Sequence, residues 1–227
     1  MTAINWFHLE NNTMIALATD TKVVLGDRDT AGRIRNFHQK IFPLPHLHSV
    51  MCGTGSDKLV LGWYSFIQSQ IIGRNIGILI EAAQRFLPEL QEAAGAAVAA
   101  IGTTIYHIGF DESGVLRGYA HRSDNGFAPE EIPPSFIMKP GMLELQQMFI
   151  DVALQGGLVA AFVELIKRQR ATKADDPAER QGIGGEVHFF AMSYRTQSLW
   201  NCYRFDDYDE EYAQILQWAK ECDDARK

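Results

Sequence analysis

Pairs of apolar segments joined by short polar turns constrain the fold of this chain most strongly. The first turn, Glu10-Asn11-Asn12-Thr13, has the composition of a hairpin turn, and so has Asp111-Glu112-Ser113-Gly114. Hairpins that follow one another predict antiparallel sheets, because parallel strands need crossover helices between them. The predicted strand pairs are residues 3–9 with 14–18, 103–110 with 115–121, and 186–193 with 198–205.

Apolar residues at helical spacing predict helices between and after these strand pairs. Ser56 is a suitable N-cap for the first helix, and Pro88 is expected to kink or break the second. Gly156-Gly157 predicts an interruption in the third. The predicted helices cover residues 56–71, 76–92, 142–170 and 209–221, the last with Tyr212, Ile215, Leu216 and Trp218 available for burial.

The remaining segments complete an α+β pattern. Residues 22–26 and 135–138 are expected as short strands, residues 27–39 as an irregular loop, residues 40–52 as an extended segment and residues 171–180 as a polar linker. Hydrophobic residues make up 46% of the chain, which suffices for a sizeable core. No composition break divides residues 1–227, so we expect one domain with helices packed outside antiparallel sheets.

Charge and composition exclude several classes of function. The formal net charge of −7 predicts repulsion from phosphate backbones and anionic membranes, so no nucleic-acid partner is expected. The N-terminal residues lack a signal-peptide pattern, and every apolar run is expected to be too short to span a bilayer. Cys52, Cys202 and Cys222 are too widely spaced for a disulfide framework or a metal-binding CxxC motif, which favours a reducing cytoplasm.

An ordered set of short motifs at the start of the chain resembles a known family. In chain order the motifs are Thr2-Ala3-Ile4, a turn at residues 10–12, a strand at residues 14–19 before Asp20, Leu25-Gly26-Asp27, Lys40-Ile41-Phe42, and Cys52-Gly53-Thr54-Gly55-Ser56. This set resembles the N-terminal-nucleophile hydrolases, specifically the bacterial proteasome-like subunits related to HslV and to the proteobacterial proteasome homologues. Residues 109–114, which resemble the central hairpin of the family, and the glycine pair Gly184-Gly185 agree more loosely with the same family.

The resemblance implies a fold, an activity and partners. The implied fold is a four-layer αββα sandwich, with two antiparallel sheets between helical layers. The implied protein is a threonine peptidase that forms a homo-oligomeric ring and cleaves peptides or unfolded proteins without a metal or a bound cofactor. Such rings often receive their substrate from an ATP-driven unfoldase.

The chemistry of a chain-terminal threonine explains the implied site. Its hydroxyl can attack a carbonyl while its own α-amine accepts the proton, once Met1 has been removed from Thr2. The resemblance implies that Lys40 is the ammonium that lowers the pKa of the amine and hydroxyl, and that Asp20 holds Lys40. It also implies that backbone N–H groups at Gly53 and Gly55 stabilise the oxyanion.

Each of these residues also has a plain structural interpretation. Thr2 is then the second residue of an ordinary chain and Lys40 an edge lysine, while Asp20 and Asp27 cap turns. A rival interpretation makes Thr13 the nucleophile and Asp27 its partner, which requires cleavage after Asn12 and discards the first apolar run.

Three departures from the family pattern leave activity open. Where the family has a serine before a glycine the chain has Pro140, and where it has an Asp and a Ser before the paired glycines the chain has Arg180 and Ile183. The alternatives are therefore an inactive scaffold subunit of the same fold or an amidase that acts on small molecules.

Other motifs predict no cofactor site. His46 and His48 are expected on one face of a strand without a third metal ligand, and His107 and His188 are expected as core or interface residues. The glycine-rich segments 53–58 and 182–185 lack the spacing of a phosphate-binding loop.

Overall fold

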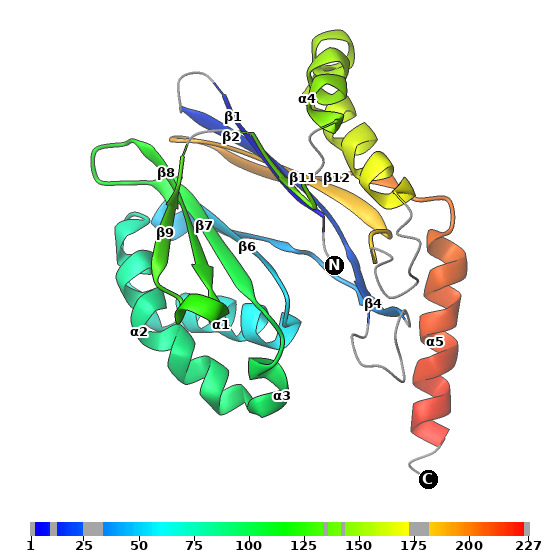
Figure 1. The fold of residues 1–227 in the computed structure, drawn as a ribbon, viewed down its shortest axis with the longest axis horizontal. Coiled ribbons are helices and arrows are strands. Elements are labelled where there is room, and N and C mark those ends of the chain that lie inside the picture. The colour runs from blue at the N-terminus through cyan, green and yellow to red at the C-terminus, as the bar shows by residue number, and fades with distance from the viewer. Residues whose placement is uncertain are drawn as a thin grey trace.

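Two five-stranded antiparallel sheets form the centre of the molecule (Figure 1). The computed structural model describes residues 3–9, 13–24, 34–133, 136–141, 144–172 and 182–224. The first sheet has the order β10-β1-β2-β11-β12 and the second the order β5-β6-β7-β8-β9, while β3 and β4 form a separate two-stranded sheet. The strands are β1 Ile4–Leu9, β2 Met14–Asp20, β3 Lys22–Val24, β4 Ile34–Phe37, β5 Ile41–Leu44, β6 Ser49–Thr54, β7 Thr104–Phe110, β8 Leu116–Arg122, β9 Pro129–Ile132, β10 Phe136–Lys139, β11 Glu186–Ser193 and β12 Gln197–Arg204.

The three predicted hairpins are present, and the first supplies the central strands of the first sheet. In its register Ile4 pairs with Thr19 and Leu9 pairs with Met14, while Asp20 pairs with Val187 of β11. The start of β1, the end of β2 and the start of β11 therefore lie together at one end of the sheet.

Two predictions about the chain before the first helix were wrong. Part of the expected irregular loop forms β4, which pairs with β3. The expected extended segment 40–52 is instead a hairpin of β5 and β6, because Pro45 begins a short 3₁₀ helix, Pro45–Leu47, that reverses the chain. His46 is thus in that turn and His48 is left-handed with φ 45°, so the two do not share a strand face.

The four predicted helices are present, and a short helix over Ala96–Ala99 was not predicted. Ser56 caps α1 by accepting a hydrogen bond from the Leu59 N–H at 3.4 Å. Pro88 lies inside α2 without ending it. Gly157 interrupts α4 with φ 81° and ψ 170°, as expected for the glycine pair. The helices are α1 Asp57–Gln70, α2 Gly77–Ala94, α3 Ala96–Ala99, α4 Leu145–Ala171 and α5 Tyr208–Asp224.

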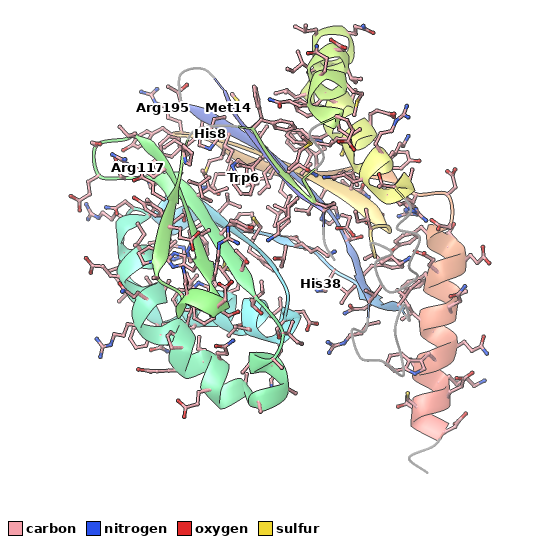
Figure 2. The ribbon with its side chains drawn as sticks, in the orientation of Figure 1. Trp6, His8, Met14, His38, Arg117 and Arg195 are labelled. Atoms are coloured by element: carbon pink, nitrogen blue, oxygen red, sulfur yellow. The ribbon has the colours of Figure 1, made fainter. Side chains whose placement is uncertain are left out.

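Three apolar cores hold the sheets and helices together. Trp63 of α1 and Leu79 of α2 pack with Met51 on the outer face of the second sheet. The two sheets face each other over a second core that includes Trp6 and Tyr106 (Figure 2). The third core lies between the first sheet and α4, whose Phe149, Phe162 and Leu165 are buried there along with Phe189 of β11.

Helix α4 is the one helix in the described part of the chain that is long and apolar enough to cross a membrane by length and composition. Its 27 residues include a stretch with a mean hydropathy of 1.8. The expectation that every apolar run is too short was therefore wrong for this helix. The burial of Phe149 and Phe162 against the first sheet identifies it as a helix that packs on that sheet.

Helix α5 stands at the edge of the fold, next to β4 (Figure 1). Tyr208 stacks on Phe37 of β4 with ring centroids 4.7 Å apart, and Glu211 forms an ion pair with Lys22. Its predicted apolar face is only partly buried within one chain: Tyr212 is 47% exposed and Leu216 is 55% exposed, while Ile215 and Trp218 are half-buried.

A buried amide pair connects β1 to α4. Asn5 and Gln169 are fully buried and exchange two side-chain hydrogen bonds of 2.9 Å, and Gln169 also donates to the Pro140 carbonyl at 2.9 Å. Buried amides must satisfy their donors and acceptors, so this pair helps to fix the position of α4 on β1.

Two buried histidines lie between the second sheet and α1. Trp63 Nε1 donates to His107 Nε2 at 2.9 Å, and His121 Nδ1 donates to the Phe127 carbonyl at 3.1 Å. These bonds put the proton of each neutral ring on Nδ1. Burial lowers the pKa of both residues, that of His107 well below 6.5, with a further contribution from the neighbouring His121.

We predict that the protein loses stability as the pH falls below about 6.5, the ordinary pKa of histidine. The unfolded chain takes up protons there that the folded chain, with its lowered pKa values, does not bind. Thermal unfolding followed between pH 8 and pH 5 checks this. His107→Gln is expected to flatten the pH dependence, whereas His46→Gln, at an exposed residue, is expected to leave it unchanged; equal slopes for the two variants would contradict the assignment.

Candidate active site

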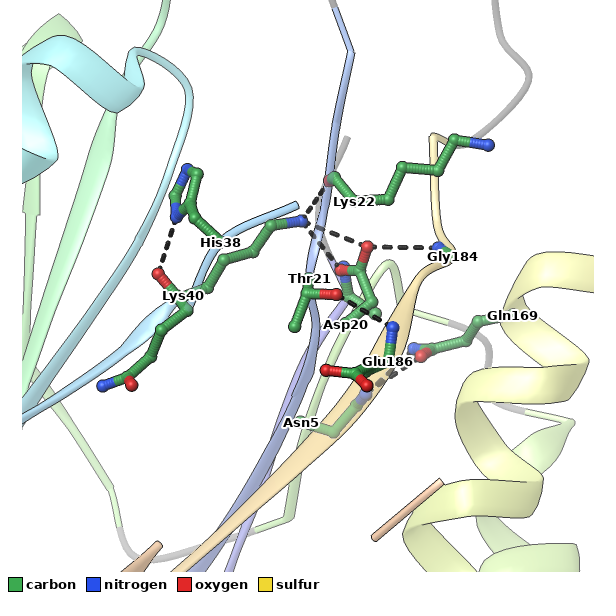
Figure 3. A network of polar contacts seen from close by, with 11 residues as sticks. Asn5, Asp20, Thr21, Lys22, His38, Lys40, Gln169, Gly184 and Glu186 are labelled. Atoms are coloured by element: carbon green, nitrogen blue, oxygen red, sulfur yellow. Dashed lines mark hydrogen bonds and ion pairs between the residues drawn. The ribbon is translucent and has the colours of Figure 1, made fainter. Parts of the chain in front are cut away.

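The centre of the candidate site is the carboxylate of Asp20, which is fully buried at the end of β2. Lys40 Nζ lies 3.0 Å from Oδ1 and 3.1 Å from Oδ2. The Ala3 N–H donates to Oδ1 at 2.9 Å and the Gly184 N–H donates to Oδ2 at 3.2 Å (Figure 3). These charged and backbone donors compensate the carboxylate for the loss of water around it.

Lys40 reaches Asp20 from the segment between β4 and β5. Its ammonium also donates to the Lys22 carbonyl at 2.6 Å, so its direction is set by three acceptor atoms. Lys40 is 5% exposed. Burial lowers its pKa, and the charge of Asp20 opposes this effect. The structure thus brings the two predicted residues together, in a geometry that excludes the interpretation of Lys40 as a solvated edge lysine.

The start of β1 is held directly by Asp20. The Ala3 nitrogen that donates to Asp20 is the nitrogen of the peptide bond joining Thr2 to Ala3. Thr2 itself lies outside the described residues, and its role as nucleophile stays a prediction. The contact nevertheless shows that Asp20 and Lys40 lie beside the residue that follows Thr2.

A cavity of about 390 Å³ opens next to Lys40. Both predicted oxyanion glycines, Gly53 and Gly55, line it. Gly55 has φ +99°, and a Cβ there would lie 2.4 Å from the Gly102 carbonyl oxygen, so the turn needs glycine. Their role in binding an oxyanion remains a prediction. The other lining residues are Lys22, Val23, Val24, Arg35, His38, Phe42, Thr54, Ser56, Asp57, Val60 and Ile101.

Sequence reasoning missed His38 as a residue of this cavity. His38 Nδ1 donates to the Gln39 carbonyl at 2.7 Å, which leaves Nε2 as an acceptor. Nε2 is buried and has no hydrogen-bond partner among the residues that the structure describes. The only sequence signal for His38 is its position two residues before Lys40, on the same side of an extended chain.

The paired glycines lie behind Asp20. Thr21 and Lys22 donate their N–H groups to the Gly184 carbonyl at 3.3 and 3.2 Å, and the Glu186 N–H donates to Thr21 Oγ1 at 2.8 Å. A Cβ at Gly185, which has φ +78°, would lie 2.5 Å from Thr21 Oγ1. The glycines therefore allow β11 to approach the end of β2 closely enough for Gly184 to reach Asp20.

The rival nucleophile lies elsewhere. Thr13 precedes Met14 at the opposite end of β2 from Asp20, and cleavage after Asn12 would remove β1, which pairs with both β10 and β2. Its predicted partner, Asp27, lies outside the described residues, as does Arg180. The positions of Thr13 and Asp20 favour the interpretation with Thr2.

Two departures from the family pattern can be located. The Pro140 carbonyl accepts a hydrogen bond from Gln169, and the Ile183 side chain is buried in the core under α4. Neither supplies a hydroxyl near Asp20. The backbone of the next residue, Gly184, contacts the carboxylate instead.

No protein-family model and no curated protein matches this sequence. Solved structures do match over nearly the whole chain. Anbu (ancestral beta-subunit) from Yersinia bercovieri has a TM-score of 0.58 at 14% identity, covering 99% of this chain and 95% of that one. The chain has the fold of the Anbu proteins.

Two further Anbu structures give the same result. A Gly-1 mutant of Anbu from Hyphomicrobium sp. strain MC1 has a TM-score of 0.59 at 13% identity, covering 99% of this chain and 97% of that one. The Anbu complex from Pseudomonas aeruginosa, a helical assembly, has a TM-score of 0.59 at 12% identity and covers 98% and 95%. The predicted proteasome-like fold is thus supported through Anbu, and these matches do not single out HslV.

We predict that Lys40→Met destabilises the protein by about 3 kcal/mol, because removing one partner of a buried ion pair leaves an uncompensated charge. Denaturant unfolding measures the loss. Arg35→Met is the matched control, since its pair with Asp57 is exposed and is worth about 0–1 kcal/mol. Equal losses in the two variants would contradict a structural role for the Asp20–Lys40 pair.

Proposed function

We propose that this chain is a proteasome-like subunit that hydrolyses peptide bonds with Thr2 as its nucleophile. The observation that carries the proposal is the buried Asp20–Lys40 pair, whose carboxylate accepts a hydrogen bond from Ala3, the residue just before β1. We also infer that residues 1–227 form one domain, and that its helices and facing sheets correspond to the four-layer αββα sandwich of N-terminal-nucleophile hydrolases.

In the first half of the proposed reaction, Thr2 Oγ attacks the substrate carbonyl carbon and its proton passes to the Thr2 α-amine. This requires prior removal of Met1. The ammonium of Lys40 disfavours a second positive charge nearby, which keeps the amine unprotonated and able to act as a base. Backbone N–H groups at Gly53 and Gly55 stabilise the negative charge that develops on the carbonyl oxygen.

In the second half, the tetrahedral intermediate collapses. The C–N bond of the substrate breaks, the leaving amine takes the proton from the Thr2 ammonium, and an ester to Thr2 Oγ remains. Water then attacks the ester, gives its proton to the amine, and releases the carboxylic acid while Oγ regains a proton. Asp20 does not react in this scheme; it holds Lys40 and the Ala3 N–H in place.

The cavity beside Lys40 suits a peptide substrate. Its wall contains the apolar side chains of Val24, Phe42 and Val60, which can receive a substrate side chain. His38 also lines this cavity, with its unpartnered acceptor Nε2 buried behind the wall. A peptide or an unfolded segment supplies such side chains.

We predict that a peptide epoxyketone forms one covalent adduct with the protein lacking Met1, and that Thr2→Ala abolishes it because the attacking hydroxyl is lost. Intact mass spectrometry before and after treatment measures both steps. Lys40→Met is expected to slow adduct formation by at least ~100-fold, within the range of acid–base catalysis. Thr13→Ala is the matched control and is expected to react like the unaltered protein.

Retained Met1 together with no adduct would overturn the Thr2 mechanism and favour the inactive scaffold subunit, for which Pro140, Arg180 and Ile183 are the motivation. An adduct that survives Thr2→Ala but not Thr13→Ala would favour the rival nucleophile.

We further propose that copies of this chain assemble with one another, in a ring or helix that encloses the sites and can receive substrate from an ATP-driven partner. Support comes from apolar side chains left exposed on one chain: Leu154 of α4 is 82% exposed and Leu216 of α5 is 55% exposed. Exposed apolar groups on helices at the edge of a fold mark surfaces that bury in an interface. The related complex from Pseudomonas aeruginosa is a helical assembly.

We predict that Leu154→Lys lowers the oligomeric mass measured by light scattering after size exclusion, because a charge would be buried in the interface. Gln155→Lys adds the same charge to the neighbouring exposed residue and is expected to change the mass less. A monomer or dimer for the unaltered protein would contradict the assembly and favour an amidase with an open cleft.

A further inference from the structure

Lys139 connects the two sheets next to the candidate site. It is the last residue of β10 and pairs with Ile4 of β1. Its side chain extends to the facing sheet, where Nζ donates to the Tyr106 hydroxyl at 2.9 Å and to Thr54 Oγ1 at 3.4 Å. The ammonium thus has a fixed position between β10, β6 and β7.

The charge of Lys139 is not neutralised by a carboxylate. Lys40 is paired with Asp20 and Lys22 with Glu211, but no ion pair of Lys139 is found among the described residues. Burial lowers the pKa of Lys139, and the charge of Arg122 on β8 lowers it further. Cys52 of β6 also faces it, but burial raises the pKa of that thiol to about 12, so it is neutral near pH 7.

The location of this unpaired charge ties it to the site. Ile4, its strand partner, is two residues from Thr2. Thr54, its hydrogen-bond partner, lies between the glycines Gly53 and Gly55 and lines the same cavity as Lys40. Partial burial of an ammonium without a carboxylate partner costs free energy. Such a charge is typical of a functional site, where it acts on the charges of neighbouring reactive groups.

We propose that Lys139 is a positioning residue of the nucleophile site, whose ammonium supplies a second fixed positive charge beside the Thr2 amine and the oxyanion turn. The inference rests on the proposed function and deepens it. One effect is to disfavour protonation of the amine, and the other is to hold Thr54 and so orient the turn from Gly53 to Gly55. Lys139 directly precedes Pro140, the position at which the family has a serine. The N–H donors of the Lys139 ammonium therefore offset the missing serine hydroxyl.

The test is the pH dependence of the rate at which a peptide epoxyketone modifies the protein. In Lys139→Met the amine loses a neighbouring positive charge, so its pKa rises and the acidic limb of the profile moves up by about one pH unit. The rate at neutral pH falls about tenfold in consequence. Lys139→Arg keeps the charge, so the acidic limb of its pH–rate profile is expected at nearly the same pH as in the unaltered protein.

Lys139 Nζ lies over the Tyr106 ring, 5.4 Å from its centre. Lys167→Met is the matched control, because Lys167 Nζ lies 4.0 Å from the centre of the Tyr203 ring but belongs to α4. It is expected to leave the limb unchanged. Tyr106→Phe removes one acceptor of Lys139 and is expected to move the limb in the same direction by less, which keeps the test open should Lys139→Met not fold.

Separate outcomes distinguish the two proposals. If the unaltered protein reacts at Thr2 and neither Lys139→Met nor Tyr106→Phe moves the limb, the role of Lys139 is overturned while the Thr2 mechanism stands. A lower melting temperature with an unmoved limb overturns that role as well, since a purely structural bridge has this effect. If the unaltered protein does not react, both proposals are overturned.

Discussion

The buried carboxylate of Asp20 organises the end of the first sheet at which β1 begins and β2 ends. A buried charge requires compensation, and here Lys40 and the N–H groups of Ala3 and Gly184 provide it. These donors come from segments on both sides of β2 and from the chain just before β5. The start of β1, the paired glycines and the lysine segment therefore all meet at Asp20.

This requirement explains features that would otherwise look unrelated. The glycine at 185 allows a close approach to Thr21, and without it the Gly184 N–H would not reach the carboxylate. The amide pair of Asn5 and Gln169 fastens β1 to α4 from the other face of the sheet. Lys139 then bridges from β10 to the facing sheet beside the same end of β1. Each contact restricts the position of the strand that begins after Thr2.

The parts of the fold predicted correctly depend on local physics. Hairpin turns and a helix cap such as Ser56 use hydrogen bonds among residues close in sequence, and those leave a pattern. The β5–β6 hairpin was missed because Pro45 reverses the chain inside what looks like one apolar run. The exposure of Leu216 on α5 was missed because helical periodicity shows that a face is apolar, not what covers it.

The residues of the candidate site also fall into those that were predicted and those that were not. Asp20 and Lys40 were predicted as partners from the resemblance, and the structure brings them into contact. His38, just after β4, and Lys139, at the end of β10, were not predicted, since a lone histidine or lysine belongs to no recognisable motif. Their importance depends on neighbours far away in sequence: a cavity beside Lys40 for one, and Thr54 and Tyr106 for the other.

By itself the sequence determined the antiparallel hairpins, the positions of the main helices and the order of the motifs around Thr2, because these follow from turn chemistry, apolar periodicity and spacing along the chain. Only the tertiary structure decided which charges are buried, which are paired, and that an unpaired ammonium lies beside the start of β1. Burial and pairing depend on which sheets face each other, and that is set by contacts between residues more than a hundred positions apart, such as Asn5 with Gln169 and Asp20 with Gly184.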